Sequence, residues 1–204
     1  MKMPFLSVPR PWWILLLTTL AGCSTSPPTH FYILTPSGDT AGSPAQGEHS
    51  IVAVGPVEVS AYLDRSQIVV REGPTRLRLA DFHQWAEPLE RNIATVLAED
   101  LRAMLPGTQP IVQPWSDLRS DYRVLAKVLR FDSDAHGRVV LHASWAVVGG
   151  RERRYRVVRD SFIETQAEGT DFEHVVLAMS EALHRLAAEM AEALREARAA
   201  PAHR

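Results

Sequence analysis

The chain has 204 residues, of which 22 are Lys or Arg and 24 are Asp or Glu, and 46% of its residues are hydrophobic. A chain of this length can bury a sizeable core in a single domain. Its slightly acidic balance argues against nucleic acid as a partner, and its lone cysteine excludes an internal disulfide.

Residues 1–22 have the pattern of a signal peptide that is cleaved. Lys2 and Arg10 give a basic start, and residues 12–20 form an apolar run that ends in small residues. The run is shorter than the roughly 20 residues that a membrane-spanning helix needs. Cleavage removes both basic residues and no acid, which leaves a formal charge of about −4.

Cys23 closes the stretch Leu20-Ala21-Gly22-Cys23, which resembles the lipobox of bacterial lipoproteins. The resemblance implies that the sulfur is diacylated and that the new amino terminus is acylated, for example with palmitate. Two or more acyl chains attach a protein stably to a membrane that it does not span. Cys23 is therefore the predicted lipidation site; the alternative is an incidental thiol at the end of an ordinary secretory signal.

Ser24 occupies the position after the cysteine, where aspartate commonly favours retention at the inner membrane. The absence of aspartate there predicts a lipid-anchored protein on the periplasmic face of the outer membrane of a Gram-negative bacterium. The sequence predicts four parts: a cleaved lipoprotein signal peptide (1–22), a lipidated N-terminus and spacer (23–30), a single α+β periplasmic domain (31–195) and a flexible tail (196–204).

Strands are predicted in the first part of the domain. Residues 31–34 form a short apolar stretch between loop-like segments rich in Ser, Pro and Gly. Alternation of apolar residues predicts a strand over 51–59. The segments 67–71 and 75–79 flank a Gly-Pro turn and predict a small antiparallel ribbon.

A helix is predicted over 85–105, where apolar residues recur at helical spacing until a Pro-Gly pair ends it. Three alternating stretches follow and predict an antiparallel meander, with a turn at 132–137 between the first two. These stretches are 122–128, 139–147 and 155–164.

The last predicted element is a long amphipathic helix. It begins with the capping-box pattern Thr170-Asp171-Phe172-Glu173 and frays beyond Arg195. Two long helices need an apolar sheet face to cover. The predicted fold class is therefore α+β, an antiparallel sheet with two long helices packed on one face.

No catalytic, metal or cofactor site is predicted. The chain has eight histidines, yet none forms a His-Glu-x-x-His pair, and the cysteine is assigned to lipid. The Gly-x-Ser-x-Gly and Ser-x-x-Lys patterns of nucleophilic hydrolases do not occur in the sequence.

The densest run of charge comprises Arg151, Arg153, Arg154, Arg156 and Arg159. Guanidinium groups can contact anionic headgroups or an acidic partner surface. The favoured interpretation is simpler: a solvated strand face whose charge blocks edge-to-edge pairing.

Two further segments place polar groups amid strand and turn residues: Tyr62-Leu63-Asp64-Arg65-Ser66-Gln67-Ile68-Val69-Val70-Arg71 and Trp85-Ala86-Glu87-Pro88-Leu89. On physical grounds they favour a structured corner over a binding site. Together with Gly55-Pro56-Val57-Glu58-Val59 and Phe31-Tyr32-Ile33-Leu34, they resemble the ABC-type transport auxiliary lipoprotein family. The resemblance is densest over residues 51–105.

The resemblance implies a non-enzymatic outer-membrane lipoprotein that works with a mammalian-cell-entry-type conduit protein of an inner-membrane transport complex. Its role would be that of a periplasmic docking adaptor for lipid transport. The family has no catalytic motif to transfer, so Cys23 is the one site that carries over. Since such conduits are ring-shaped, the resemblance also leaves open whether this protein forms a homo-oligomer.

Two other functions also stay open. The domain could itself hold an acyl chain or phospholipid between its sheet and helices, or it could be a periplasmic hydrolase. The apolar positions are just sufficient for a sheet with two helices, which disfavours the first, and no residue spacing indicates the second.

Overall fold

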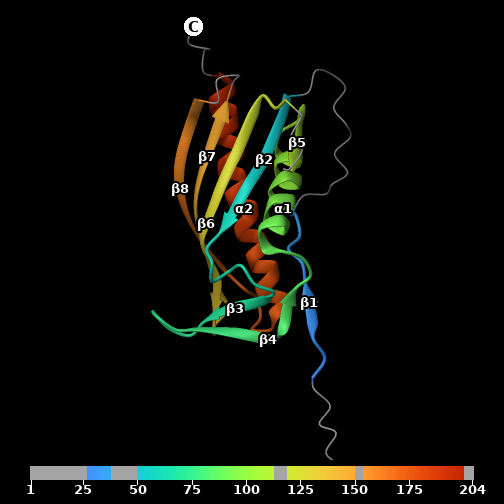
Figure 1. The fold of residues 1–204 in the computed structure, drawn as a ribbon, viewed down its shortest axis with the longest axis vertical. Coiled ribbons are helices and arrows are strands. Elements are labelled where there is room, and N and C mark those ends of the chain that lie inside the picture. Colours follow the sequence, from blue (N-terminus) through green and yellow to red (C-terminus); the bar gives the residue numbers. More distant parts are fainter. Residues whose placement is uncertain (1–26, 38–49, 113–118, 150–153, 200–204) are drawn as a thin grey trace, which may run out of the picture.

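The computed structural model describes residues 27–37, 50–112, 119–149 and 154–199. In this part of the chain eight strands form one sheet, and two helices lie against one of its faces (Figure 1). The elements are β1 (His30–Tyr32), β2 (Ser50–Val59), β3 (Gln67–Arg71), β4 (Leu77–Trp85), α1 (Leu89–Met104), β5 (Thr108–Val112), β6 (Tyr122–Asp134), β7 (Arg138–Gly149), β8 (Arg154–Gln166) and α2 (Phe172–Ala199).

The sheet is organised around β6. One edge of β6 pairs antiparallel with β7, which pairs antiparallel with β8. The other edge pairs parallel with β2 and then, at the C-terminal end of β6, with β3. From there the sheet continues in two directions, from β2 to β5 and from β3 through β4 to β1.

The prediction of an antiparallel sheet is wrong, because the sheet is mixed. Four of the seven strand pairs formed by the described residues are parallel, namely β1 with β4, β2 with β5, β2 with β6, and β3 with β6. Parallel neighbours need a long crossover connection, and the segment containing α1 supplies one between β2 and β5. The antiparallel ribbon and the three-stranded meander are confirmed as β3–β4 and β6–β7–β8.

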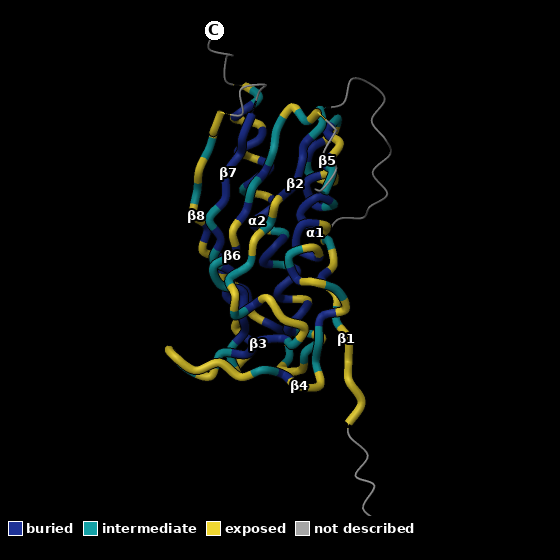
Figure 2. The backbone as a smooth tube through the Cα atoms, in the orientation of Figure 1, coloured by how far each residue is buried: buried dark blue, intermediate teal, exposed yellow. Residues whose placement is uncertain are grey.

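The core lies between the sheet and the helices (Figure 2). α1 contacts β2 and β5, α2 contacts β6, β7 and β8, and the helices contact each other. Leu141 and Trp145 of β7 are buried there with Leu97 of α1 and Leu186 of α2. Burial of each such side chain stabilises the fold by about 1.5–3 kcal/mol relative to exposure.

The helix boundaries differ from the prediction at both ends of α2. Its first turn is capped by Asp171, whose Oδ1 accepts a hydrogen bond from the backbone N–H of His174 at 3.1 Å. The capping box predicted at Thr170 is therefore wrong by one residue. At its other end α2 continues to Ala199, past Arg195, where the sequence predicted fraying.

Neither described helix has a stretch that is both long and apolar enough to cross a membrane.

Candidate functional site

The predicted lipidation site, Cys23, and its neighbour Ser24 lie outside the described residues. What the structure describes is how the following segment joins the domain. β1 pairs in parallel with the end of β4, which places His30 beside His83 and Tyr32 beside Trp85. The chain that leads back to Cys23 thus leaves from one end of the domain, which we call the tethered end: β1, β3, β4 and the first turn of α2 (Figure 1).

Residues 33–37, the strap, run from β1 onto both helices. The N–H of Leu34 donates to Oδ1 of Asn92 on α1 at 2.7 Å, and the N–H of Thr35 donates to Oγ of Ser180 on α2 at 3.1 Å. The N–H of Ser37 donates to Oδ1 of Asp100 on α1 at 3.0 Å. All three acceptor side chains are buried. The strap therefore fixes the chain that follows β1 to the helical layer.

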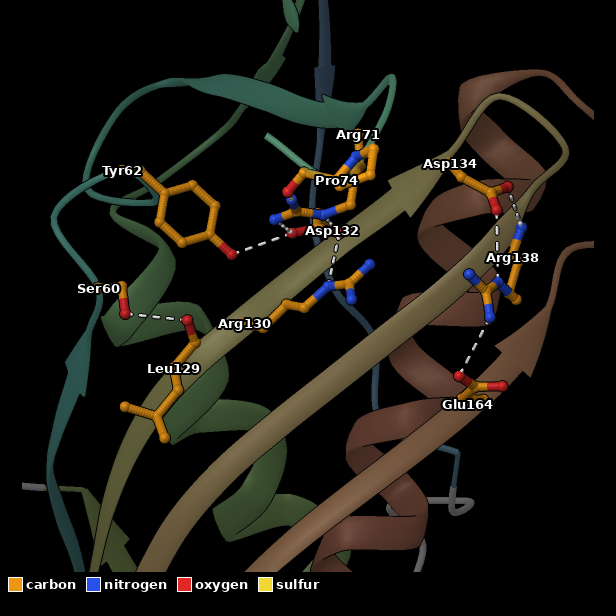
Figure 3. A network of polar contacts seen from close by, with 10 residues as sticks. All are labelled: Ser60, Tyr62, Arg71, Pro74, Leu129, Arg130, Asp132, Asp134, Arg138 and Glu164. Atoms are coloured by element: carbon orange, nitrogen blue, oxygen red, sulfur yellow. Dashed lines mark hydrogen bonds and ion pairs between the residues drawn. The ribbon is translucent and has the colours of Figure 1, made fainter. Parts of the chain in front are cut away.

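The segment that carries the family resemblance converges on a buried carboxylate (Figure 3). Asp132, fully buried near the end of β6, accepts a hydrogen bond from the Tyr62 hydroxyl at 3.0 Å. Arg71 donates to both of its oxygens, from Nε at 3.0 Å and from Nη2 at 2.8 Å. Arg130 adds a bond from Nε at 2.9 Å. We call these four residues the polar corner.

The polar corner joins β3 and the preceding loop to β6. Burial and the neighbouring Asp132 carboxylate raise the pKa of Tyr62 to about 12, and the hydrogen bond to Asp132 also raises the pKa of Arg71. The tyrosine is therefore a neutral donor and the arginine a permanent cation at physiological pH. With four donor atoms on one carboxylate, the corner has the character of a structural junction, as the sequence favoured.

Asp132 itself was missed, because the sequence analysis placed it in a turn. β6 in fact continues to Asp134, and the turn contains only the residues between Asp134 and Arg138. A buried partner for Tyr62 and Arg71 could have been sought among the acids of later strands, but it lies 61 residues beyond Arg71.

The arginine run is only partly described by the structure. Arg151 and Arg153 lie outside the described residues. Arg154 and Arg156 are exposed on β8, which pairs only with β7 among the described strands. Arg159 reaches α2: its Nη2 lies 2.9 Å from Oε2 of Glu196, and its guanidinium lies 6.0 Å from the centre of the Trp145 ring. Arg159 thus has a structural contact.

An open groove lies at the tethered end, between β1 with the strap on one side and the first turns of α2 on the other. Its volume is about 780 Å³. We call it the end groove, and it is lined by His30, Phe31, Tyr32, Ile33, Thr35, His83, Asp171, Phe172, Glu173, Val176 and Leu177.

A stack of rings forms part of the lining of the end groove. The rings of His83 and Phe172 are stacked with centroids 4.0 Å apart, and His30 stacks on His83 at 5.5 Å. The Tyr32 hydroxyl is hydrogen bonded to Nδ1 of His83 at 2.8 Å. Burial, and secondarily the charge of His30, lower the pKa of His83, which favours the neutral imidazole.

The lining of the groove also includes exposed acidic and apolar groups. Asp171 pairs with His174, with 2.6 Å between Oδ2 and Nδ1, and the hydrogen bonds from His174 hold the pKa of Asp171 below its usual value. Phe31, Ile33 and Leu177 are exposed beside it. Among the described residues, no three His, Cys, Asp or Glu side chains gather where they could hold a metal ion.

Comparison with known proteins identifies the family. The family model for the ABC-type transport auxiliary lipoprotein component matches residues 32–191. The intermembrane transport lipoprotein PqiC of Escherichia coli (strain K12) is 26% identical over 170 residues, which cover 81% of this chain and 89% of PqiC.

Two solved structures share the fold. One, an uncharacterised protein, superimposes with a TM-score of 0.70 at 20% identity and covers 82% of this chain and 99% of its own. A protein of Xanthomonas campestris gives a TM-score of 0.64 at 19% identity and covers 82% and 98%. The chain belongs to the family of ABC-type transport auxiliary lipoprotein components.

Proposed function

We propose that this protein is anchored through Cys23 to the periplasmic face of the outer membrane, where its domain acts as a docking adaptor. The partner is a mammalian-cell-entry-type conduit of an inner-membrane transport complex, and the cargo is lipid. Family membership carries the proposal, since the matched family is described as a transport component. The relative PqiC is named as an intermembrane transport lipoprotein.

The division of the chain follows from the same proposal. Residues 1–22 are removed, residues 23–30 carry the lipid and form the spacer, and the folded domain follows. The strap supports this division, because it binds the chain to both helices within 14 residues of Cys23. A domain held so close to its anchor presents a defined part of its surface to the periplasm.

Two substitutions test attachment to a membrane separately from the choice between the inner and the outer membrane. Cys23→Ala should release the protein from membranes and abolish transport, whereas Ser24→Asp should keep the lipid but move the protein to the inner membrane. Membrane fractionation and mass spectrometry of the N-terminus measure both. Full transport function of the soluble Cys23→Ala form would contradict the proposal.

Crosslinking in native envelopes tests the partner. A bifunctional crosslinker applied to intact cells, followed by mass spectrometry, should recover an inner-membrane conduit protein with the wild type and lose it with Cys23→Ala. Recovery of the same conduit protein with both forms would show that anchoring is not needed for docking.

The alternative of an acyl chain held between the sheet and the helices gains no support from the fold. That space is occupied by buried side chains, among them Leu183, Leu186 and Met190 of α2.

A further inference from the structure

We propose that the end groove is a membrane contact: Phe31, Ile33 and Leu177 rest at the boundary between headgroups and acyl chains of the bilayer that holds Cys23. This inference rests on the proposed lipid anchor and goes beyond it, because it assigns a second attachment site and an orientation to the domain.

The apolar rim of the groove is the first observation. The exposed fractions are 66% for Phe31, 51% for Ile33 and 55% for Leu177. The first two come from β1 and the strap and the third from α2, so two segments far apart in the sequence bring exposed apolar side chains to one groove. Clustered exposed apolar groups mark interaction surfaces, unlike scattered ones.

The reach of the tether is the second observation. Cys23 precedes His30, the first residue of β1, by seven residues. Such a segment extends at most about 25 Å. α2, with 28 residues, is about 42 Å long and starts at the end groove. The tether is therefore too short to bring the far end of α2 to the bilayer while β1 stays at its tethered end.

The charge of the groove limits how deep the contact goes. Asp171 and Glu173 line the groove and are exposed, and burying an ionised carboxylate in hydrocarbon is costly. The carboxylates stay at the level of the headgroups, where they favour the ammonium group of phosphatidylethanolamine. The contact adds to the lipid anchor as a second, interfacial attachment signal.

The experiment uses the lipidated protein in vesicles of phosphatidylethanolamine with a minor share of phosphatidylglycerol. Because acylation consumes the sulfur of the only cysteine, a new cysteine is the only free thiol. A fluorophore is attached to Leu177→Cys in one sample and to Val158→Cys in another. Val158 is the matched control, since it is 69% exposed and lies on β8, away from the groove. Quenching by brominated phospholipid reports contact with acyl chains.

The expected result is quenching at position 177 that exceeds quenching at position 158 by at least about two-fold, as interfacial insertion of the rim requires. Equal quenching, or stronger quenching at position 158, would overturn the proposed orientation. No quenching at either position, in protein whose mass includes the acyl groups and which floats with the vesicles, would overturn the contact and leave the anchor intact. A mass without acyl groups would overturn the anchor and this inference together.

Discussion

The polar corner and the end groove both gather polar and aromatic side chains from distant segments. They differ in how many of these side chains are left exposed to solvent. In the polar corner, the buried Asp132 carboxylate receives four donor atoms from three side chains. In the end groove, the stacked rings of His30, His83 and Phe172 line an open groove, and apolar side chains stand exposed at the rim.

This difference suggests that the polar corner stabilises the fold, whereas the end groove provides a surface for interaction. A buried carboxylate that already accepts hydrogen bonds from four donor atoms contributes to the fold and has little left to offer a ligand. An open groove with an apolar rim contributes little to the fold, because its surface is still in contact with water. Substitutions in the corner should therefore change the free energy of unfolding, and those at the rim should change membrane contact.

The largest effect is expected for Asp132→Asn. This change keeps the shape of the side chain but removes the charge that faces Arg71 and Arg130. Breaking a buried ion pair on one side costs about 3 kcal/mol. Urea unfolding measures the loss. Asp160→Asn on β8, where the side chain is exposed, is the control and should stay within about 0.5 kcal/mol. Equal effects of the two changes would contradict the structural role of the corner.

A smaller effect, about 1 kcal/mol at neutral pH, is expected for Tyr62→Phe, which removes one hydrogen bond to Asp132. The effect depends on pH in a defined direction. The pKa of Tyr62 is about 12 in the folded protein and 10.0 ordinarily. The stabilisation is complete below pH 10 and is lost as pH rises toward 12, because the unfolded chain releases its proton first.

Unfolding free energies of the wild type and Tyr62→Phe should therefore converge above pH 10. Tyr155→Phe, on the exposed face of β8, controls for the substitution itself. A difference between wild type and Tyr62→Phe that stays constant from pH 8 to the alkaline limit would be inconsistent with the raised pKa.

The cap of α2 tests the border between the two regions, because Asp171 belongs to the groove and also begins the helix. Asp171→Ala should lower the melting temperature, whereas Thr170→Ala should not. The hydrogen bonds from His174 lower the pKa of Asp171, so its contribution is present above its ordinary value of 3.8 and is lost as pH falls through the folded-state value. Thermal scans of both variants at neutral and acidic pH check this. A larger loss of melting temperature for Thr170→Ala than for Asp171→Ala would favour the capping box predicted at Thr170.

The smallest effect on stability is expected at the rim. Leu177→Ser should change the free energy of unfolding by no more than about 0.5 kcal/mol, because the side chain is exposed. It should still weaken the residual vesicle binding that the non-lipidated Cys23→Ser protein retains at high lipid concentration, whereas Val158→Ser should not. Co-sedimentation with vesicles, alongside urea unfolding, gives both quantities. If Leu177→Ser lowered the free energy of unfolding without weakening vesicle binding, the rim would have a structural role and not a role in membrane contact.

Local patterns in the sequence predicted the individual elements well. The helical spacing over 85–105 corresponds to α1, although the helix starts only at Leu89, because Trp85 is the last residue of β4 and Pro88 is the N-cap. The three alternating stretches correspond to β6, β7 and β8. Periodicity reports which side of an element is apolar, and this depends only on neighbouring residues. The buried polar residues of the helices were not predicted, because Asn92, Asp100 and Ser180 are explained by hydrogen bonds to the strap.

The sequence by itself determined the family, the ribbon and meander, and the two amphipathic helices, and it is the sole basis of the mature N-terminus proposed at Cys23. Only the tertiary structure decided that β2 and β3 pair in parallel with β6, that Asp132 is the partner of Tyr62 and Arg71, and that β1 brings His30 to His83 and the first turn of α2. The reason is physical. Periodicity and turn residues act over a few positions, whereas strand order, the closure of a polar network and the shape of a groove depend on contacts between segments that the sequence places 50 or more residues apart.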